Sequence, residues 1–354
     1  MLVIGGTGFI GGRLVERLLI EEGADVRVMV REWHKAVWVS RTTAELVAGD
    51  VLDYGSLRRA VEGCAIVFDC ASGPSAEGGY QRTNVEGSRN VIRACRESGV
   101  RRCVYVSTIA VHGNDPPEKL GPSSPLVETG RDYSDSKVIA EKLFSEAYAR
   151  DQFPVVTIRP TYVWGPRSAL FTVRQLREMK EGRFCLVDHG RARSHAVYID
   201  NLVDALLLAG VQPRVCGMAF IITDDQPYTW AEFFGHYQRM AQVGEMRNLS
   251  SLSWRDRAGC RFLDRCQRVV EKLQGNSIPL PIKVIRRMVF VAGKLLARRY
   301  MSEWDMKKYA RESLIDMEDA RASLGYHPSW TLEEGMRETA RWVEDQLPAL
   351  KTTG

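Results

Sequence analysis

The residues best suited to acid–base chemistry are a tyrosine and a lysine four positions apart, in the run Tyr133-Ser134-Asp135-Ser136-Lys137. On a helix this spacing places both side chains on one face. A phenol has a reference pKa of about 10, so it needs help to act near neutral pH. We expect the ammonium group of Lys137 to lower the pKa of Tyr133 and make it a usable proton donor and acceptor.

A pair of hydroxyl residues ends the apolar run Tyr105-Val106-Ser107-Thr108. A parallel sheet presents the carboxyl ends of its strands to ligands. A hydroxyl at such an end can hydrogen-bond a substrate oxygen and stabilise charge as a hydride moves. We assign this role to Thr108, with Ser107 as the second candidate and a strand-end cap as the alternative interpretation.

A glycine-rich loop, Gly5-Gly6-Thr7-Gly8-Phe9-Ile10-Gly11, separates the first apolar run from the first amphipathic stretch. Gly5 permits a tight turn, Gly8 lets backbone approach a pyrophosphate, and Gly11 lets helix and strand pack closely. The following helix N-terminus offers amide donors to phosphates. The loop therefore predicts a dinucleotide site.

The second strand, Val26 to Val30, ends without an acid to bind a ribose 2′-hydroxyl, and Arg31 follows it directly. A guanidinium suits a 2′-phosphate, and Lys35 can add a second charge. We therefore expect NADP(H) as the preferred cofactor, with NAD(H) as the alternative. A solvated surface arginine is the other interpretation of Arg31. Asp50 is expected to accept from the adenine amino group.

The elements that position these residues follow from alternating patterns in the first half of the chain. Apolar runs predict strands at Leu2–Ile4, Val26–Val30, Ile66–Cys70, Cys103–Ser107 and Val155–Ile158, and amphipathic stretches predict helices such as 13–22, 80–97 and 133–150. This alternation predicts an α/β fold with a doubly wound parallel sheet of the Rossmann type. We expect a dinucleotide-binding domain over residues 1–160, with a return strand near 218–223. A smaller C-terminal substrate lobe should cover 161–354 and include a basic helical insertion at 246–311.

The composition is that of a globular protein: 354 residues, 45% hydrophobic and 26% charged. The apolar start leaves no room for a signal sequence, and no 18-residue apolar run occurs, so a cytoplasmic location is expected. The eight cysteines form no Cys-x-x-Cys pair, which favours free thiols and no metal site.

Positive charge is concentrated in residues 246–311, which hold 16 Lys/Arg and five Asp/Glu. Within 282–300, one expected helical face carries Ile285, Met288, Val289, Ala292, Leu295 and Leu296, whereas Lys283, Arg286, Arg287, Lys294 and Arg298 lie away from it. This pattern predicts peripheral contact with an anionic membrane, or else a lid helix packed on its own protein. No aromatic interleaving is present, so no nucleic-acid partner is expected.

Seven motifs occur in a fixed order: the Gly5–Gly11 loop, Gly49-Asp50-Val51, the run 84–91, Ser107/Thr108, Tyr133/Lys137, the run 159–166 and the run 198–201. This set resembles the extended short-chain dehydrogenases/reductases, the NAD-dependent epimerase/dehydratase superfamily, over nearly the whole chain. The runs 221–227 and 320–328, with the long insertion before residue 312, resemble the 3β-hydroxysteroid dehydrogenase-like and sterol-carboxylate dehydrogenase-like members.

The resemblance implies catalysis by Thr108, Tyr133 and Lys137, with Asn84 near the cofactor and backbone around Val163 holding its carboxamide. The expected cofactor contacts are Gly5, Thr7, Gly8, Phe9, Ile10, Gly11, Arg31, Lys35, Asp50, Val51, Ala71, Ser107, Tyr133, Lys137, Pro160 and Val163. The expected substrate contacts are Ser72, Thr108, Tyr162, Trp164, Arg193 and His195. Family members commonly dimerise through two helices that fall here at 82–97 and 133–150, so a homodimer is expected. The chain departs from the pattern at His112, where Tyr is common.

Together these features predict an oxidoreductase that moves a hydride between nicotinamide and a hydroxyl or ketone of a bulky, steroid-like small molecule. A nucleotide-sugar epimerase or reductase is the alternative, because Arg193 precedes Asp200 by seven residues and Arg167 can assist it with a diphosphate. A sugar dehydratase is disfavoured, since Ile109 and Ala110 replace the acidic run after Thr108. A non-catalytic NADP(H)-binding regulator is a third alternative, although such proteins typically lose the Tyr or the Lys.

Overall fold

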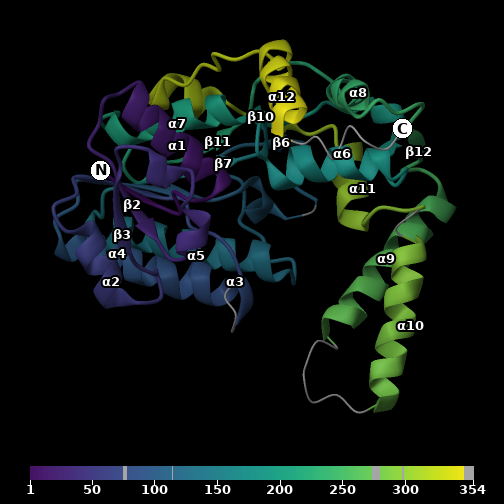
Figure 1. Ribbon diagram of the computed structural model, residues 1–354, viewed down its shortest axis with the longest axis horizontal. Helices are drawn as coiled ribbons and strands as arrows, with labels where there is room; N and C mark the ends of the chain where they lie inside the picture. The colour runs from purple at the N-terminus through teal and green to yellow at the C-terminus, as the bar shows by residue number, and fades with distance from the viewer. Residues whose placement is uncertain (75–77, 114, 273–279, 297–298, 347–354) are drawn as a thin grey trace. The chain divides into compact units, whose positions relative to one another are not determined.

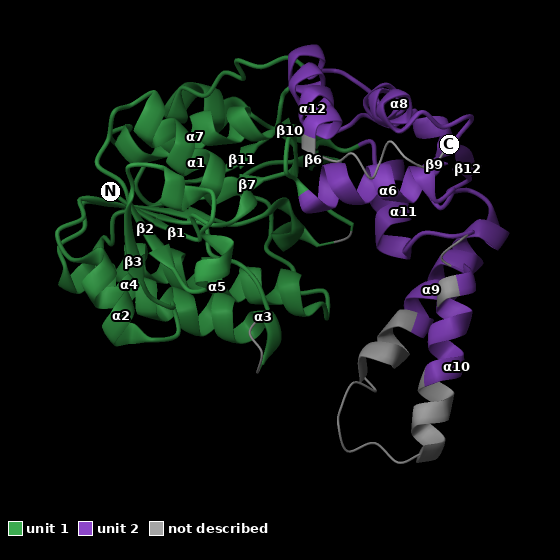
Figure 2. Cartoon of the chain, viewed as in Figure 1, with its two compact units in different colours: residues 1–168, 195–225, 313–331 green, residues 169–194, 226–312, 332–354 purple. Residues whose placement is uncertain are grey.

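The computed structural model describes residues 1–74, 78–113, 115–272, 280–296 and 299–346 (Figure 1). The chain divides into two compact units (Figure 2). Unit 1 comprises residues 1–168, 195–225 and 313–331, and unit 2 comprises 169–194, 226–312 and 332–354. Unit 1 thus contains the return strand expected near 218–223, together with segments 161–168, 195–217 and 313–331, which the sequence assigns to the C-terminal lobe.

Unit 1 is built on a seven-stranded sheet with the strand order β11-β7-β5-β4-β1-β2-β3. Every neighbouring pair is parallel. The strands are β1 (Leu2–Ile4), β2 (Arg27–Val30), β3 (Glu45–Ala48), β4 (Ile66–Asp69), β5 (Arg102–Val106), β7 (Val155–Pro160) and β11 (Ala219–Ile222). The order reverses between β1 and β4, the switch point beside which such sheets bind ligands. The predicted doubly wound parallel sheet is confirmed.

Helices cover both faces of this sheet (Figure 1). One layer contains α1 (Phe9–Ile20) and α7 (Ile199–Val211), which pack on each other, and α7 also packs on β5 and β7. The other layer contains α2 (Tyr54–Val61), α4 (Gly87–Glu97) and α5 (Asp132–Asp151). A short helix α3 (Gly79–Gln81) and a π-helical turn at Arg82–Glu86 lead into α4. The packing of α7 on the sheet explains why residues 195–225 belong to unit 1.

Three two-stranded pairs complete the strands of the described chain. They are β8 (Tyr162–Trp164) with β10 (Ala196–Tyr198), β6 (Lys119–Leu120) with β13 (Leu314–Ile315), and β9 (Cys185–Val187) with β12 (Arg247–Leu249). The pairing of β6 with β13 anchors residues 313–331 to unit 1. The Pro-rich stretch 115–125 thus contains a short strand with a buried residue, Leu120.

Unit 2 is mainly helical. Its helices are α6 (Arg174–Lys180), α8 (Trp230–Ala241), α9 (Trp254–Lys272), α10 (Leu280–Leu296), α11 (Glu303–Ala310) and α12 (Leu332–Gln346). An aromatic cluster forms its core, in which Trp230 stacks on Phe234 at 5.4 Å and meets Tyr309 edge-on at 4.9 Å. A capping box between Thr229 and Glu232 starts α8 by satisfying its first amide groups. Of the basic helical insertion, the side chains of Lys283, Ile285, Arg286, Lys294 and Arg298 lie outside the described residues.

Candidate active site

Tyr133 lies in the first turn of α5 and is half-buried. Thr108 follows β5 and is 9% exposed. Burial raises the pKa of Tyr133, and Thr108 offsets part of that increase. The net shift is upward, because desolvation of the phenol outweighs the effect of Thr108.

Lys137 is 2% exposed, and its Nζ donates to the backbone carbonyl of Val106 at 2.8 Å. The same Nζ lies 4.8 Å from the centre of the Tyr105 ring. Burial lowers the pKa of Lys137 to about 8, while the nearby Asp69, Cys70 and Glu141 raise it. The ammonium is therefore held at the end of β5 by a neutral carbonyl and is favoured by the nearby carboxylates of Asp69 and Glu141.

Asp69 is a charged residue of this site that the sequence motifs did not identify. It ends β4, is 3% exposed, and pairs in register with Tyr105 of β5. Burial raises its pKa to about 6, and Lys137 acts in the opposite direction. Near neutral pH, Asp69 is thus a carboxylate close to Lys137. The sequence shows Asp69 at the end of an apolar run, but the strand predicted at Ile66–Cys70 includes it, so it was not assigned to the site.

Ser107 is hydrogen-bonded away from the position where a substrate oxygen would meet Tyr133. Its Oγ donates to Glu141 at 2.6 Å, and Arg159 Nε donates to the same carboxylate at 2.9 Å. Arg159 also donates to the carbonyl of Pro122, and its Nη1 lies 3.3 Å from Nε2 of His112. Ser107 is committed to this buried network. Thr108 Oγ1 accepts from Ala110 N at 3.2 Å, so it forms the strand-end cap of the alternative interpretation, and its hydroxyl hydrogen remains to donate to a substrate oxygen.

Asn84 lies in the π-helical turn 82–86 and donates to Ser136 Oγ at 2.9 Å, which ties it to α5. Its Oδ1 is buried and has no hydrogen-bond partner among the residues that the structure describes. Turns of this kind often occur at functional sites. Tyr80, which the motifs did not indicate, meets the Tyr133 ring edge-on at 5.2 Å. These contacts place Asn84 and Tyr80 beside the first turn of α5.

The glycine loop has the conformation that a dinucleotide site requires. Gly5 has a φ of 77°, and a Cβ there would lie 2.8 Å from the carbonyl carbon of Cys70. A Cβ at Gly11 would lie 2.4 Å from the Gly5 oxygen, so helix and loop pack too closely for a side chain. Gly8 is exposed, and α1 has neither a side-chain cap nor an acid in its first turn. Its first amide groups therefore fit a pyrophosphate; Thr7, Phe9 and Ile10 of this loop are half-buried.

The residues after β2 form an exposed cluster of opposite charges. Glu32 Oε1 accepts from Arg31 at 2.9 Å and from Lys35 at 2.8 Å, and Oε2 lies 3.6 Å from His34. Hydrogen bonds from Lys35 and Arg31 lower the pKa of Glu32 to about 2. The two expected cations, Arg31 and Lys35, thus lie together. The group that joins them is the carboxylate of Glu32, which is not among the expected cofactor residues.

The remaining expected cofactor residues lie at the carboxyl ends of strands in unit 1. Asp50 Oδ1 accepts from Leu52 N at 3.0 Å, and Val51 is buried. Ala71 donates its amide to Asp69 at 3.1 Å. Pro160 ends β7, and the carbonyl of Val163 in β8 accepts from Ser168 at 3.0 Å. The seven-stranded sheet therefore brings Asp50, Ala71 and Pro160 to one edge, whereas Val163 lies within the separate β8–β10 pair.

The expected substrate residues differ in accessibility. Ser72 is exposed, and Tyr162 and His195 are half-buried in unit 1. Trp164 is fully buried and donates to Asp224 at 3.2 Å, which does not support its assignment as a substrate contact. Arg193 is exposed in unit 2, where its backbone forms a bridge with Thr229.

Arg167, the second expected phosphate ligand, is already engaged within unit 1. Its guanidinium lies 4.7 Å from the centre of the Trp38 ring, and Nη1 lies 3.5 Å from Glu16. Arg167 therefore contacts Trp38 and Glu16 of its own unit, and these contacts do not support its expected role as a diphosphate ligand.

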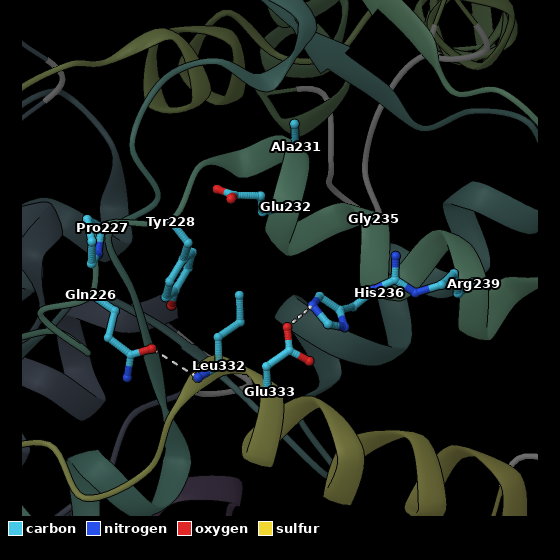
Figure 3. Close-up of a pocket in the computed structure, with 10 residues that line it drawn as sticks. All are labelled: Gln226, Pro227, Tyr228, Ala231, Glu232, Gly235, His236, Arg239, Leu332 and Glu333. Carbon is cyan, nitrogen blue, oxygen red and sulfur yellow. Dashed lines mark hydrogen bonds and ion pairs between the residues drawn. The ribbon is translucent and has the colours of Figure 1, made fainter.

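A separate hollow of about 530 Å³ lies in unit 2, between α8 and the start of α12 (Figure 3). Its polar groups pair with each other: His236 Nε2 lies 3.4 Å from Glu333, and Gln226 accepts from Leu332 N at 3.0 Å. No residue of the Tyr133 site lines it. Its polar lining makes it unsuited to a bulky apolar ketone.

The parallel sheet, the glycine loop and the Tyr133/Lys137 pair on α5 define an extended short-chain dehydrogenase/reductase, the superfamily of oxidoreductases and epimerases. The model of the 3-beta hydroxysteroid dehydrogenase/isomerase family matches residues 2–250. The chain belongs to that family, which confirms the resemblance found in its motifs.

Two curated relatives match almost the whole chain. A 2-alkyl-3-oxoalkanoate reductase from Stenotrophomonas maltophilia is 30% identical, over 95% of this chain and 97% of its own. A decarboxylating sterol-4-alpha-carboxylate 3-dehydrogenase from Saccharomyces cerevisiae is 26% identical, over 98% of each. Among solved structures, UDP-glucuronic acid 4-epimerase from Bacillus cereus, in complex with NAD, has a TM-score of 0.70 with 15% identity, covering 97% of this chain and 98% of its own. That likeness shows the fold. Among the described helices, none is sufficiently long and apolar to span a membrane.

Proposed function

We propose that the protein is an NADP(H)-dependent oxidoreductase that transfers a hydride between nicotinamide and a hydroxyl or ketone carbon of a bulky, largely apolar substrate. The observation that carries this proposal is the placement of Tyr133 and Lys137 one turn apart on α5, with Lys137 Nζ donating to the carbonyl of Val106 at the end of β5, two residues before Thr108. The glycine loop follows β1, and parallel strands end at the same edge, so both features lie on the edge where such sheets bind ligands.

In the reductive direction, bound NADPH supplies the hydride to the carbonyl carbon. Tyr133 donates its proton to the carbonyl oxygen, and the Thr108 hydroxyl orients that oxygen. Lys137 provides the positive charge that stabilises the phenolate left on Tyr133. Asn84 fixes the start of α5 through Ser136 and so holds Tyr133 in place. In the oxidative direction Tyr133 takes the proton from the hydroxyl.

Preference for NADP(H) is supported by the cations beside the end of β2. Arg31, His34 and Lys35 gather around one carboxylate, that of Glu32. A 2′-phosphate presents more negative charge than that carboxylate and can form bidentate hydrogen bonds with Arg31. In our proposal Glu32 holds the cations in place, and the phosphate takes over their hydrogen bonds on binding.

The names of the two curated relatives suggest a narrower substrate class. In a 2-alkyl-3-oxoalkanoate and in a sterol 4-carboxylate with a 3-hydroxyl, the reacting carbon is one carbon away from the carbon that bears the carboxylate. We propose that this chain also acts on a β-oxo or β-hydroxy acid with a large apolar substituent. Oxidation of such a hydroxy acid gives a β-oxo acid, which can lose its carboxylate as CO₂ and leave a ketone.

The first experiment is titration of the purified protein with NADPH and NADH, with mass spectrometry of any cofactor that co-purifies. We expect loose binding that favours NADPH, followed by oxidation of NADPH when a 2-alkyl-3-oxo acid is added. Tightly retained NAD⁺ without net consumption would instead identify an epimerase. Cofactor binding without turnover of any ketone would favour the non-catalytic regulator.

The residue assignment is tested by Tyr133→Phe. Removing the proton donor should lower kcat by about 10²- to 10⁴-fold while NADPH affinity changes little. Tyr54→Phe is the matched control, because Tyr54 lies at the start of α2 and bonds to Glu97, away from Thr108. Unchanged turnover in Tyr133→Phe would refute the mechanism.

A further inference from the structure

The ring of Tyr133 needs support from outside its own helix. Side chains on an α-helix point back toward its N-terminus. Tyr133 is the second residue of α5, which begins at Asp132, so no earlier turn of that helix lies beneath its ring. A half-buried ring in this position can change rotamer unless another segment packs on it. The orientation of the proton donor therefore depends on a contact from elsewhere in the chain.

Tyr80 supplies such a contact. Its ring meets the ring of Tyr133 edge-on, with 5.2 Å between the ring centres and 73° between the ring planes. This is a preferred geometry for two aromatic rings, and it favours one orientation of the Tyr133 ring over others. The hydroxyl of Tyr80 forms no hydrogen bond with any described residue. The contact therefore belongs to the ring of Tyr80 and does not need its hydroxyl.

The backbone of Tyr80 is fastened to the same end of α5. Its amide donates to Oδ2 of Asp132 at 2.8 Å, and Asp132 immediately precedes Tyr133. Two neighbouring residues of α5 thus hold Tyr80, one through its backbone and the next through its ring. The short helix α3, which contains Tyr80, accordingly packs on α5 (Figure 1).

Two glycines give the chain the path that this contact requires. Gly78 and Gly79 have φ angles of 86° and 58°, in the left-handed region that side-chain-bearing residues rarely adopt. A Cβ at Gly79 would lie 2.5 Å from Oδ2 of Asp132, the same oxygen that accepts from the amide of Tyr80. A side chain at position 79 would therefore displace either the carboxylate or the backbone of Tyr80.

We propose that Tyr80 is a positioning residue for the oxidoreductase reaction: Asp132 and Gly79 fix its backbone, and its ring sets the orientation in which Tyr133 delivers the proton. The effect on turnover rests on the proposed function, whereas the ring contact does not. A displacement of about 1 Å between reacting groups can cost about a hundredfold in rate, so the orientation of this phenol matters for catalysis.

Steady-state kinetics with NADPH and a 2-alkyl-3-oxo acid tests the role in turnover. Tyr80→Ala should lower kcat about 10- to 100-fold, because the Tyr133 hydroxyl is aligned with the carbonyl oxygen for less of the time. The KM for the oxo acid should change little, and Tyr80→Phe, which keeps the ring, should restore kcat. An equal loss in Tyr80→Phe would overturn the proposal. A raised KM with unchanged kcat would do the same, since it would make Tyr80 a substrate contact.

Substitutions in the two residues that hold the backbone should reproduce the effect. Gly79→Ala and Asp132→Ala should lower kcat as Tyr80→Ala does, whereas Asp132→Asn keeps an acceptor for the Tyr80 amide and should retain most activity. Gly63→Ala is the matched control, because Gly63 has a φ of 76° but a Cβ there meets no described atom within 4 Å. Tyr54→Ala controls for loss of a ring from α2. Circular dichroism establishes that each variant is folded. Normal kcat in Gly79→Ala, or an equal loss in Gly63→Ala, would contradict the proposal.

Fluorine NMR of the full chain with 3-fluorotyrosine in place of Tyr133 examines the ring without turnover. Tyr80→Ala and Gly79→Ala should each shift its resonance, because the ring of Tyr80 leaves, whereas Tyr54→Ala and Gly63→Ala should not. A resonance that stays in place in Tyr80→Ala would refute the contact even in an active enzyme. If the wild-type protein reduces no ketone but its resonance responds as expected, the proposed function fails and the ring contact is supported.

Discussion

Removal of the carboxylate of Glu141 should destabilise unit 1 more than most single substitutions. The side chains of Glu141 and Arg159 are 2% and 6% exposed, and Ser107 donates to the same carboxylate. Glu141→Gln leaves the guanidinium buried without its counter-charge, for which the expected cost is about 3–5 kcal/mol. That is a large share of the roughly 5–15 kcal/mol by which proteins are stable.

Urea unfolding followed by circular dichroism and fluorescence measures this loss. Lys142→Gln on the same helix is the control, because its ion pair with Glu128 is 3.5 Å long and about half exposed, so it should change stability by less than about 1 kcal/mol. The double variant Glu141→Met, Arg159→Met should recover much of the loss, since it leaves no buried charge unpaired. A loss below about 1 kcal/mol in Glu141→Gln would refute the argument that this pair is an essential buried contact.

The remaining predictions concern the cofactor and the pH profile. Arg31→Ala should weaken NADPH about ten- to a hundredfold and NADH far less, measured by fluorescence titration with Arg41→Ala as the control; equal losses would contradict the 2′-phosphate role. Asp69→Asn should move the alkaline limb of kcat/KM to lower pH. Burial already lowers the pKa of Lys137 to about 8, Asp69 is foremost among the groups that raise it, and its removal lets the ammonium lose its proton sooner. A limb that stays in place would show that Asp69 does not act on Lys137.

The sheet was predictable from the sequence because most of its strands are buried on both faces and form continuous apolar runs. The prediction at Leu2–Ile4 coincides with β1, and four others agree with β2, β4, β5 and β7 within two residues at each end. We missed β3 because it begins with the exposed Glu45 and none of its residues is buried. An edge strand of that kind lacks the continuous apolar run from which the other strands were predicted.

The candidate site was predictable only where its residues form local patterns. Tyr133, Lys137 and the glycine loop have fixed spacings, whereas Asp69 and Tyr80 reach α5 from other segments of the chain. Glu141 could have been found, because it follows Lys137 by four residues on the same helical face. Trp164 was chosen by its position in a motif, and no local pattern shows that its ring is buried against Tyr198.

The direction of the Tyr133 pKa shift depends on burial, which the sequence does not supply, and it bears on how the site works. Four ionisable side chains, Asp69, Lys137, Glu141 and Arg159, are each at most 5% exposed in unit 1. Burying such groups is costly unless opposite charges and hydrogen bonds compensate. Here two are acids and two are cations, and the Glu141 carboxylate that accepts from Arg159 also accepts from Ser107. Ser107 precedes Thr108, and Lys137 is bonded to the carbonyl of Val106, so the same charges fix the end of β5 against α5. In the proposed mechanism, this arrangement keeps Tyr133 protonated until charge develops on a substrate oxygen, which is the state that a proton donor for ketone reduction requires.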